Sequence, residues 1–110
     1  MTGNEYQQDA LRTVSDRERD DLLTEGVLGL SGETGEVSDI VKKYKYQGHA
    51  LNEKGLAKEL GDIAWYLAIT AHAIGYSLDE ILLMNMDKRR KRYPEGFAKE
   101  RSLNREEDDE

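Results

Sequence analysis

The spacing of apolar residues along the chain predicts four helices. Apolar positions recur at steps of three and four residues in four segments, which polar or glycine-containing stretches separate. The segments run from about 4 to 14, from 16 or 20 to about 44, from 53 to 74, and from 77 to about 92. The single proline and the scarcity of β-branched runs agree with this pattern. The sequence therefore predicts an all-α fold.

Residues typical of helix ends flank the third and fourth segments. Asn52 can cap the N-terminus of the third helix, and Gly75 can end it in a left-handed conformation. Ser77 and Glu80 have the spacing of a capping box at the start of the fourth helix. Pro94 follows its predicted end.

Four glycines interrupt the second predicted helix at intervals of three residues: Gly26, Gly29, Gly32 and Gly35. Each costs about 1 kcal/mol relative to alanine inside a helix, so a break near Ser31-Gly32 is one expectation. If the helix continues, something must approach its backbone closely at the glycines.

Length and composition limit the kind of protein. A chain of 110 residues fits one small domain, near the lower limit for burying its own core, so an oligomer is expected. We assign residues 1–98 to a single helical domain and residues 99–110 to a polar, flexible tail. The net charge of -7 argues against a nucleic-acid partner. No apolar stretch suits a signal peptide or a membrane helix, which predicts a cytoplasmic protein with no membrane partner.

Two pairs of acidic residues lie in the segments poorest in charge. Projected as a helix, the second segment places Glu33 within its apolar arc and Glu36 at the edge of that arc. From 59 to 75 the third segment contains two acidic residues, Glu59 and Asp62, and no lysine or arginine. Side chains three residues apart on a helix are neighbours, so each pair forms a two-carboxylate claw. The alternative reading of any single glutamate is an ordinary solvent-exposed position.

Carboxylates in such surroundings need a compensating partner. An ionised carboxylate on a buried helix costs several kcal/mol unless a cation or hydrogen bonds neutralise it. The chain has no cysteine and the claws contain no histidine, which favours Mg2+, with Mn2+ as a substitute, over zinc.

The E-x-x-E and E-x-x-D pairs, with the sequence around them, resemble the MazG-like, all-α nucleoside triphosphate pyrophosphohydrolases. The similar blocks are GLSGETGEVSDIVKK, KELGDIAWYLA and NMDKRRKRYPEGF, and EYQQDALRT is similar to the opening helix of short family members. Together they cover most of the chain from Tyr6 to Phe97. One departure is Arg89, where the family often has an apolar residue.

This resemblance implies a four-helix-bundle-type core completed by homo-oligomerisation, as a homodimer or a homotetramer. It implies Mg2+ bound by four residues: Glu33, Glu36, Glu59 and Asp62. The implied substrate is a nucleoside triphosphate, an NTP or a dNTP, which is hydrolysed to the nucleoside monophosphate and pyrophosphate. For catalysis, Glu33 or Glu36 would orient or deprotonate the attacking water.

On the fourth predicted helix, Asn85, Lys88 and Arg92 share one face, and we expect them to bind the triphosphate. The alternative is that these cations only compensate the helix dipole, as we expect for Arg89 and its neighbours. We expect Trp65 and Tyr66 to be core residues, and the alternative is that either ring stacks on the base of the nucleotide.

Two other functions compete with the hydrolase interpretation. An iron-binding helical bundle would use E-x-x-H pairs, and no glutamate here has a histidine three residues on. A non-catalytic helical oligomeric interaction module, with a vestigial acidic site, remains the alternative function. The intact set of four carboxylates favours the enzyme.

Overall fold

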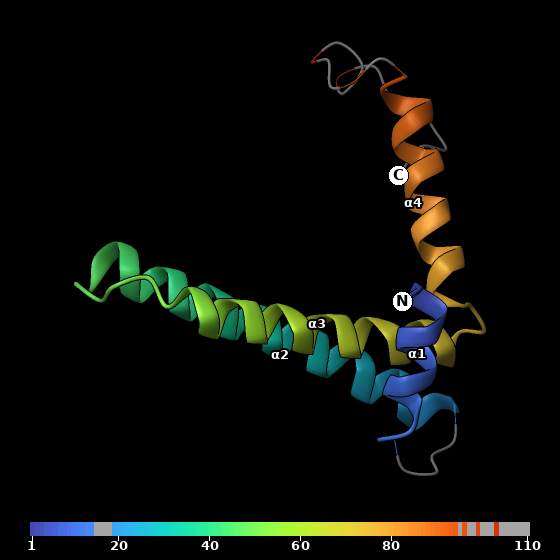
Figure 1. The fold of residues 1–110 in the computed structure, drawn as a ribbon, viewed down its shortest axis with the longest axis horizontal. Coiled ribbons are helices and arrows are strands. Elements are labelled where there is room, and N and C mark those ends of the chain that lie inside the picture. Colours follow the sequence, from blue (N-terminus) through green and yellow to red (C-terminus); the bar gives the residue numbers. More distant parts are fainter. Residues whose placement is uncertain (15–18, 95, 97–98, 100–102, 104–110) are drawn as a thin grey trace. The chain divides into compact units, whose positions relative to one another are not determined.

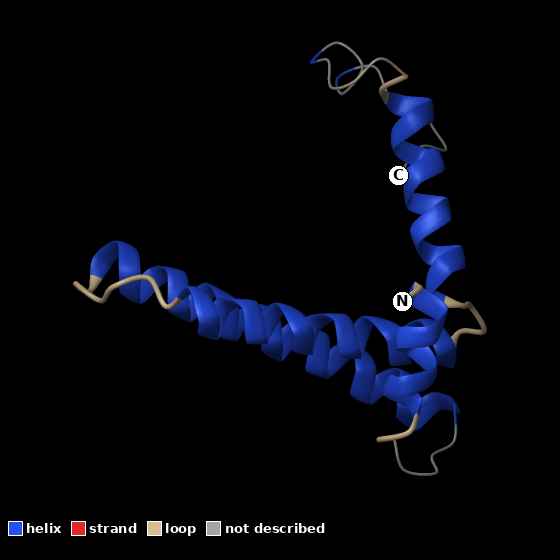
Figure 2. Ribbon diagram, viewed as in Figure 1, coloured by secondary structure: helices blue, strands red, loops and turns tan. Residues whose placement is uncertain are grey.

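The computed structural model describes residues 1–14, 19–94, 96, 99 and 103. The chain divides into two compact units, Met1–Leu78 and Asp79–Glu110, and each is described by itself. The described residues form four helices and no strand: α1 (Gly3–Leu11), α2 (Arg19–Tyr46), α3 (Glu53–Ala73) and α4 (Leu78–Arg92) (Figures 1 and 2). The predicted all-α class is thus confirmed.

Local hydrogen bonds explain where the helices of the first unit begin and end. The Asn52 Oδ1 atom accepts a hydrogen bond from the Gly55 N–H at 3.0 Å, which caps α3 as predicted. Gly75 adopts a φ of 84°, the left-handed conformation expected of the residue that ends this helix. Arg19 also donates from Nε to the Ala73 carbonyl at 2.9 Å, which satisfies one of the last carbonyl groups of α3.

The first helix is shorter than the pattern predicted. It ends at Leu11, and the Thr13 N–H and hydroxyl both donate to the Ala10 carbonyl, at 3.2 and 2.9 Å. These bonds close tight turns instead of continuing the α-helix to Val14.

The break considered near Ser31-Gly32 does not occur, because α2 is continuous from Arg19 to Tyr46. It lies alongside α3 (Figure 1), and two of its glycines are sites of close approach. A Cβ atom added at Gly26 would meet the side chain and backbone of Thr70, and one at Gly29 would overlap the ring of Tyr66. The absence of a side chain at these two positions therefore lets the helices pack closely enough to offset the glycine penalty.

The core of the first unit lies where α1, the N-terminal half of α2 and the C-terminal half of α3 meet. One cluster contains Ala10, Ala68 and Leu78, and a second contains Leu22, Ile69 and Ala73. Among the described residues only Ile69 combines a large side chain with almost complete burial. The rest of the α2–α3 hairpin, toward its connecting loop, contains no buried residue in the range 30–64.

In the second unit, α4 carries four basic residues in its last turn and acidic residues in its first, which suits the helix dipole. The predicted flexible tail, 99–110, falls almost wholly outside the described residues, as does the earlier start considered for the second helix at Asp16. No single helix of the described part is long and apolar enough to cross a membrane.

Candidate metal centre

The register of the α2–α3 pair explains why distant acidic residues meet. Gly26 lies against Thr70, and Gly29 lies against Tyr66. Each step of three or four residues forward along α2 is therefore matched by a step of about four back along α3, as antiparallel helices require. One more step brings Glu33 to the level of Asp62. The close glycine crossing thus sets the register that gathers the carboxylates.

Three of the four predicted carboxylates form one cluster. An oxygen from each of Glu33, Glu59 and Asp62 lies within 4.8 Å of the other two. Glu33 and Glu59 are partly buried, and Asp62 is exposed. Two helices thus contribute to one group of oxygen atoms, as the double claw predicted.

The electrostatics of Glu33 show how closely these groups approach. A hydrogen bond with the Glu59 side chain, then partial burial and the charges of Glu59, Asp62 and Glu36, raise the pKa of Glu33 from 4.5 to about 7. A hydrogen bond between two carboxyl groups requires a proton on one of them. The Glu33 side chain is therefore the carboxyl group of this cluster that ionises with most difficulty.

Glu36 is not within this group of three, although its charge is close enough to act on Glu33. Its side chain is exposed, in agreement with its predicted place at the edge of the apolar arc. Three residues, most of one turn of α2, separate it from Glu33, and the helix register brings it to the level of Glu59.

The donor set fits a hard divalent cation. It offers only carboxylate oxygens, which are the ligands that Mg2+ and Mn2+ prefer. The hydrogen bond with Glu59 and the nearby carboxylate charges that raise the pKa of Glu33 show that acidic groups are crowded here, and a divalent cation held by them would compensate that repulsion.

Comparison with known proteins agrees with this geometry. The MazG nucleotide pyrophosphohydrolase domain family matches residues 23–97, which include all four carboxylates. The chain belongs to this family. It is also 32% identical over 82 residues to the Gene 37 protein of Mycobacterium phage L5, an alignment that covers 71% of this chain and 72% of that protein. No solved structure matches the chain.

The MazG family is one of nucleotide pyrophosphohydrolases, and its members act on nucleoside triphosphates and depend on a divalent metal. The match begins at Leu23 and therefore includes most of α2 and the whole of α3 and α4. It does not include α1, so the role of α1 must be argued from its contacts.

The residues expected to bind substrate lie in the second unit. Asn85 is exposed, and its Oδ1 accepts a hydrogen bond from Arg89 Nε at 3.0 Å, so Arg89 does more than compensate the helix dipole. Lys88 and Arg92 are partly buried, and the Arg92 guanidinium lies 6.0 Å from the centre of the Tyr93 ring. Because the two units are described separately, the contact of these residues with a triphosphate stays a prediction.

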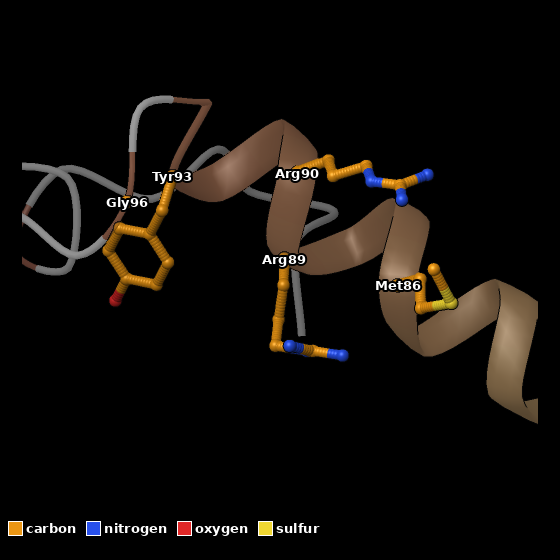
Figure 3. Close-up of a pocket in the computed structure, with 5 residues that line it drawn as sticks. All are labelled: Met86, Arg89, Arg90, Tyr93 and Gly96. Carbon is orange, nitrogen blue, oxygen red and sulfur yellow. The ribbon is translucent and has the colours of Figure 1, made fainter.

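Figure 3 shows a pocket at the C-terminal end of α4 that contains none of the carboxylates. Arg89 and Tyr93 project to one side of the helix and Arg90 projects to another. Its other lining residues are Met86 and Gly96. The side chains do not converge on a common point, so the carboxylate cluster, and not this pocket, is the candidate site.

The aromatic residues beside the cluster are used in packing. Trp65 packs against both core clusters and donates from Nε1 to Thr13 Oγ1 at 3.1 Å. Tyr66 lies over Gly29 and meets the Trp65 ring edge-to-face, with 5.0 Å between ring centres. Both histidines, His49 and His72, are exposed.

Sequence reasoning did not identify two residues of α1 that lie beside α3. Gln7 is buried and binds three backbone groups, at Ala68, Tyr76 and Leu78. Tyr6 donates its hydroxyl to the Gly61 carbonyl at 3.4 Å, next to Asp62. The available signal was the presence of Gln7 on the stripe formed with Ala10, Leu11 and Val14, since a polar residue on an apolar stripe indicates a specific partner.

Proposed function

We propose that this chain is a Mg2+-dependent nucleoside triphosphate pyrophosphohydrolase, which hydrolyses an NTP or a dNTP to the nucleoside monophosphate and pyrophosphate. The observation that carries the proposal is the convergence of Glu33, Glu59 and Asp62 within 4.8 Å on adjacent helices. Crowded carboxylates destabilise a fold unless a cation compensates them, so their convergence indicates a binding role. Membership of the MazG family supplies the reaction class.

Four side chains would hold the metal: Glu33, Glu36, Glu59 and Asp62. A bound Mg2+ would neutralise the triphosphate and promote ionisation of the attacking water. Exposed Glu36 has room to turn toward a ligand, and Glu33 would bind the cation in its ionised form. Either of these two carboxylates can orient the water or accept its proton.

Asn85, Lys88 and Arg92 would bind the phosphate and sugar groups from α4. Arg89 donates to the Asn85 oxygen, which leaves the amide N–H groups of Asn85 as donors toward an anion. Lys88 and Arg92 would supply positive charge to the phosphates.

The proposed active form is a homodimer or a homotetramer. Large apolar side chains are exposed along the first unit, among them Val27 (50%), Leu28 (67%) and Leu60 (53%). At Gly32 and Gly35 no atom of the described chain lies within 4 Å of the place where a Cβ would stand, so no helix of the described chain packs closely against these two glycines. A second copy packed on this face would bury both features. Light scattering coupled to size exclusion should give twice or four times the 12.6 kDa chain mass.

The test is incubation with each NTP and dNTP in Mg2+, with pyrophosphate measured before and after EDTA. Glu59→Gln and Asp62→Asn should each lower turnover by at least about 100-fold, because removing a metal ligand weakens both cation and substrate binding. Glu53→Gln is the matched control, since Glu53 lies in the first turn of α3 and outside the cluster. Absence of pyrophosphate from every nucleotide would favour the alternative, a non-catalytic interaction module.

A further inference from the structure

The helix α1 is attached to α3 by a buried polar side chain. Gln7 Nε2 donates to the carbonyls of Ala68 and Tyr76, at 3.0 and 3.2 Å, and Gln7 Oε1 accepts from the Leu78 N–H at 3.0 Å. One of these bonds joins α1 to α3, and two join it to the segment that follows α3. Together, from a side chain that is only 3% exposed, they fix the position of α1 beside α3. The position of the preceding residue, Tyr6, is fixed with it.

Tyr6 lies lengthwise along α3. Its ring packs against the cluster of Ala10, Ala68 and Leu78, and its hydroxyl reaches the Gly61 carbonyl at 3.4 Å. Ala68 and Gly61 are seven residues apart, which is two turns or about 10 Å of helix. The ring is therefore anchored in the core while the hydroxyl reaches the turn that carries the carboxylates.

Gly61 lies between two residues of the cluster, Glu59 and Asp62. Burial, and then the charges of Asp62 and Asp9, raise the pKa of Tyr6, so the phenol keeps its proton and remains a donor. A neutral donor can stabilise a crowded anionic turn without adding a charge that would compete with a cation.

We propose that Tyr6 is a positioning residue for the metal centre: from α1, its hydroxyl fixes the turn of α3 that presents Glu59 and Asp62. This inference rests on the proposed metal-dependent function. It assigns to α1, which lies outside the matched MazG domain, a role in divalent-cation affinity. The hydroxyl does not touch the substrate, and it acts through the two carboxylates.

The experiment compares Tyr6→Phe with Tyr46→Phe in the full-length chain. Both variants remove one phenolic hydroxyl, and Tyr46 is 79% exposed. The phenylalanine at position 6 keeps the ring that packs on the core. Mn2+ binding, measured by the paramagnetic resonance signal of free Mn2+ with circular dichroism as the check on folding, gives a readout independent of turnover.

We expect Tyr6→Phe to raise the Mn2+ dissociation constant about 3- to 10-fold. This is at the lower end of the effect of residues that orient metal ligands, because the hydrogen bond from the Tyr6 hydroxyl is long. Tyr46→Phe should bind as the unaltered chain does. Turnover by Tyr6→Phe should be low at limiting Mg2+ and should return to the normal kcat at saturating Mg2+, which a general loss of folded protein would not produce.

Equal Mn2+ affinity in Tyr6→Phe and Tyr46→Phe would overturn the role of Tyr6 and leave the proposed function intact. Failure of the unaltered chain to bind Mn2+ would overturn both. Loss of affinity in Tyr6→Phe that saturating Mg2+ does not compensate would also reject the positioning role, because the hydroxyl would then act beyond metal binding.

Discussion

Replacing Gly29 by alanine tests the close crossing of α2 and α3 that sets the register of the site. A Cβ at this position would overlap three carbon atoms of the Tyr66 ring, so the ring must leave its place. Tyr66 also packs edge-to-face on Trp65, at 5.0 Å between ring centres, and against the second core cluster. The substitution therefore disturbs two aromatic residues and the separation of the helices.

Three contributions determine how much Gly29→Ala changes the free energy of unfolding. Overpacking of this severity costs about 3 kcal/mol, and loss of the edge-to-face pair costs about 0.5–1 kcal/mol. Alanine recovers about 1 kcal/mol of helix propensity. The net destabilisation is about 2.5–3 kcal/mol, which lowers the melting temperature of a chain this size by about 10–12 °C.

Gly32→Ala is the matched control on the same helix. No atom of the described chain lies within 4 Å of the Cβ it would add, so in the dissociated chain only the propensity gain of about 1 kcal/mol remains. Both variants are melted in EDTA at equal protein concentration, because association with a second copy would make the midpoint depend on concentration. The near-ultraviolet circular dichroism of Trp65, the single tryptophan, reports the displacement of Tyr66. If Gly29→Ala were as stable as Gly32→Ala and left this signal unchanged, the close crossing would be wrong.

Three further predictions concern the stability of the chain. Gln7→Leu should lower the free energy of unfolding by about 2–3 kcal/mol, because it leaves the buried Leu78 N–H without its partner, whereas exposed Gln8 can be replaced by leucine with little effect on the denaturant midpoint. The metal-free chain should lose stability as the pH rises from about 4.5 to about 7. Folding raises the pKa of Glu33 across that range, so the folded state binds more protons there than the unfolded state does. Urea titrations should show a flatter dependence of stability on pH for Glu33→Gln, and a dependence identical to that of the unaltered chain would contradict this origin. Mg2+ at about 100 times its dissociation constant should stabilise the chain at pH 8 by about 2.7 kcal/mol, and Asp62→Asn should abolish the shift in melting temperature.

The sequence predicted the helices well because their ends carry local signals. Asn52 and Gly75 act through bonds and dihedral angles within a few residues, and both behave as predicted. The continuity of α2 could not be predicted in this way. Whether Gly26 and Gly29 break the helix depends on Thr70 and Tyr66, which are about forty residues away along the chain.

The candidate site shows the same division between local and long-range information. Helical spacing paired Glu59 with Asp62, and the structure places both in the cluster. Spacing also paired Glu33 with Glu36, and here the exposure of Glu36 depends on the angle at which α2 faces α3. Tyr6 was not identified because its proximity to Asp62 requires the attachment of α1 through Gln7, which no local pattern contains.

The glycines and the carboxylates of α2 are parts of one arrangement. Gly26 and Gly29 let α3 approach closely, and the register that results places Glu33 beside Glu59 and Asp62. This approach is unfavourable enough to raise the pKa of Glu33 to about 7. Moving the helices apart would relieve the repulsion and also remove the Tyr66–Gly29 packing, so the fold cannot lower the cost of the cluster without losing core contacts. A divalent cation bound by the proposed site would resolve this conflict, because it would neutralise the carboxylates while the helices stay in contact.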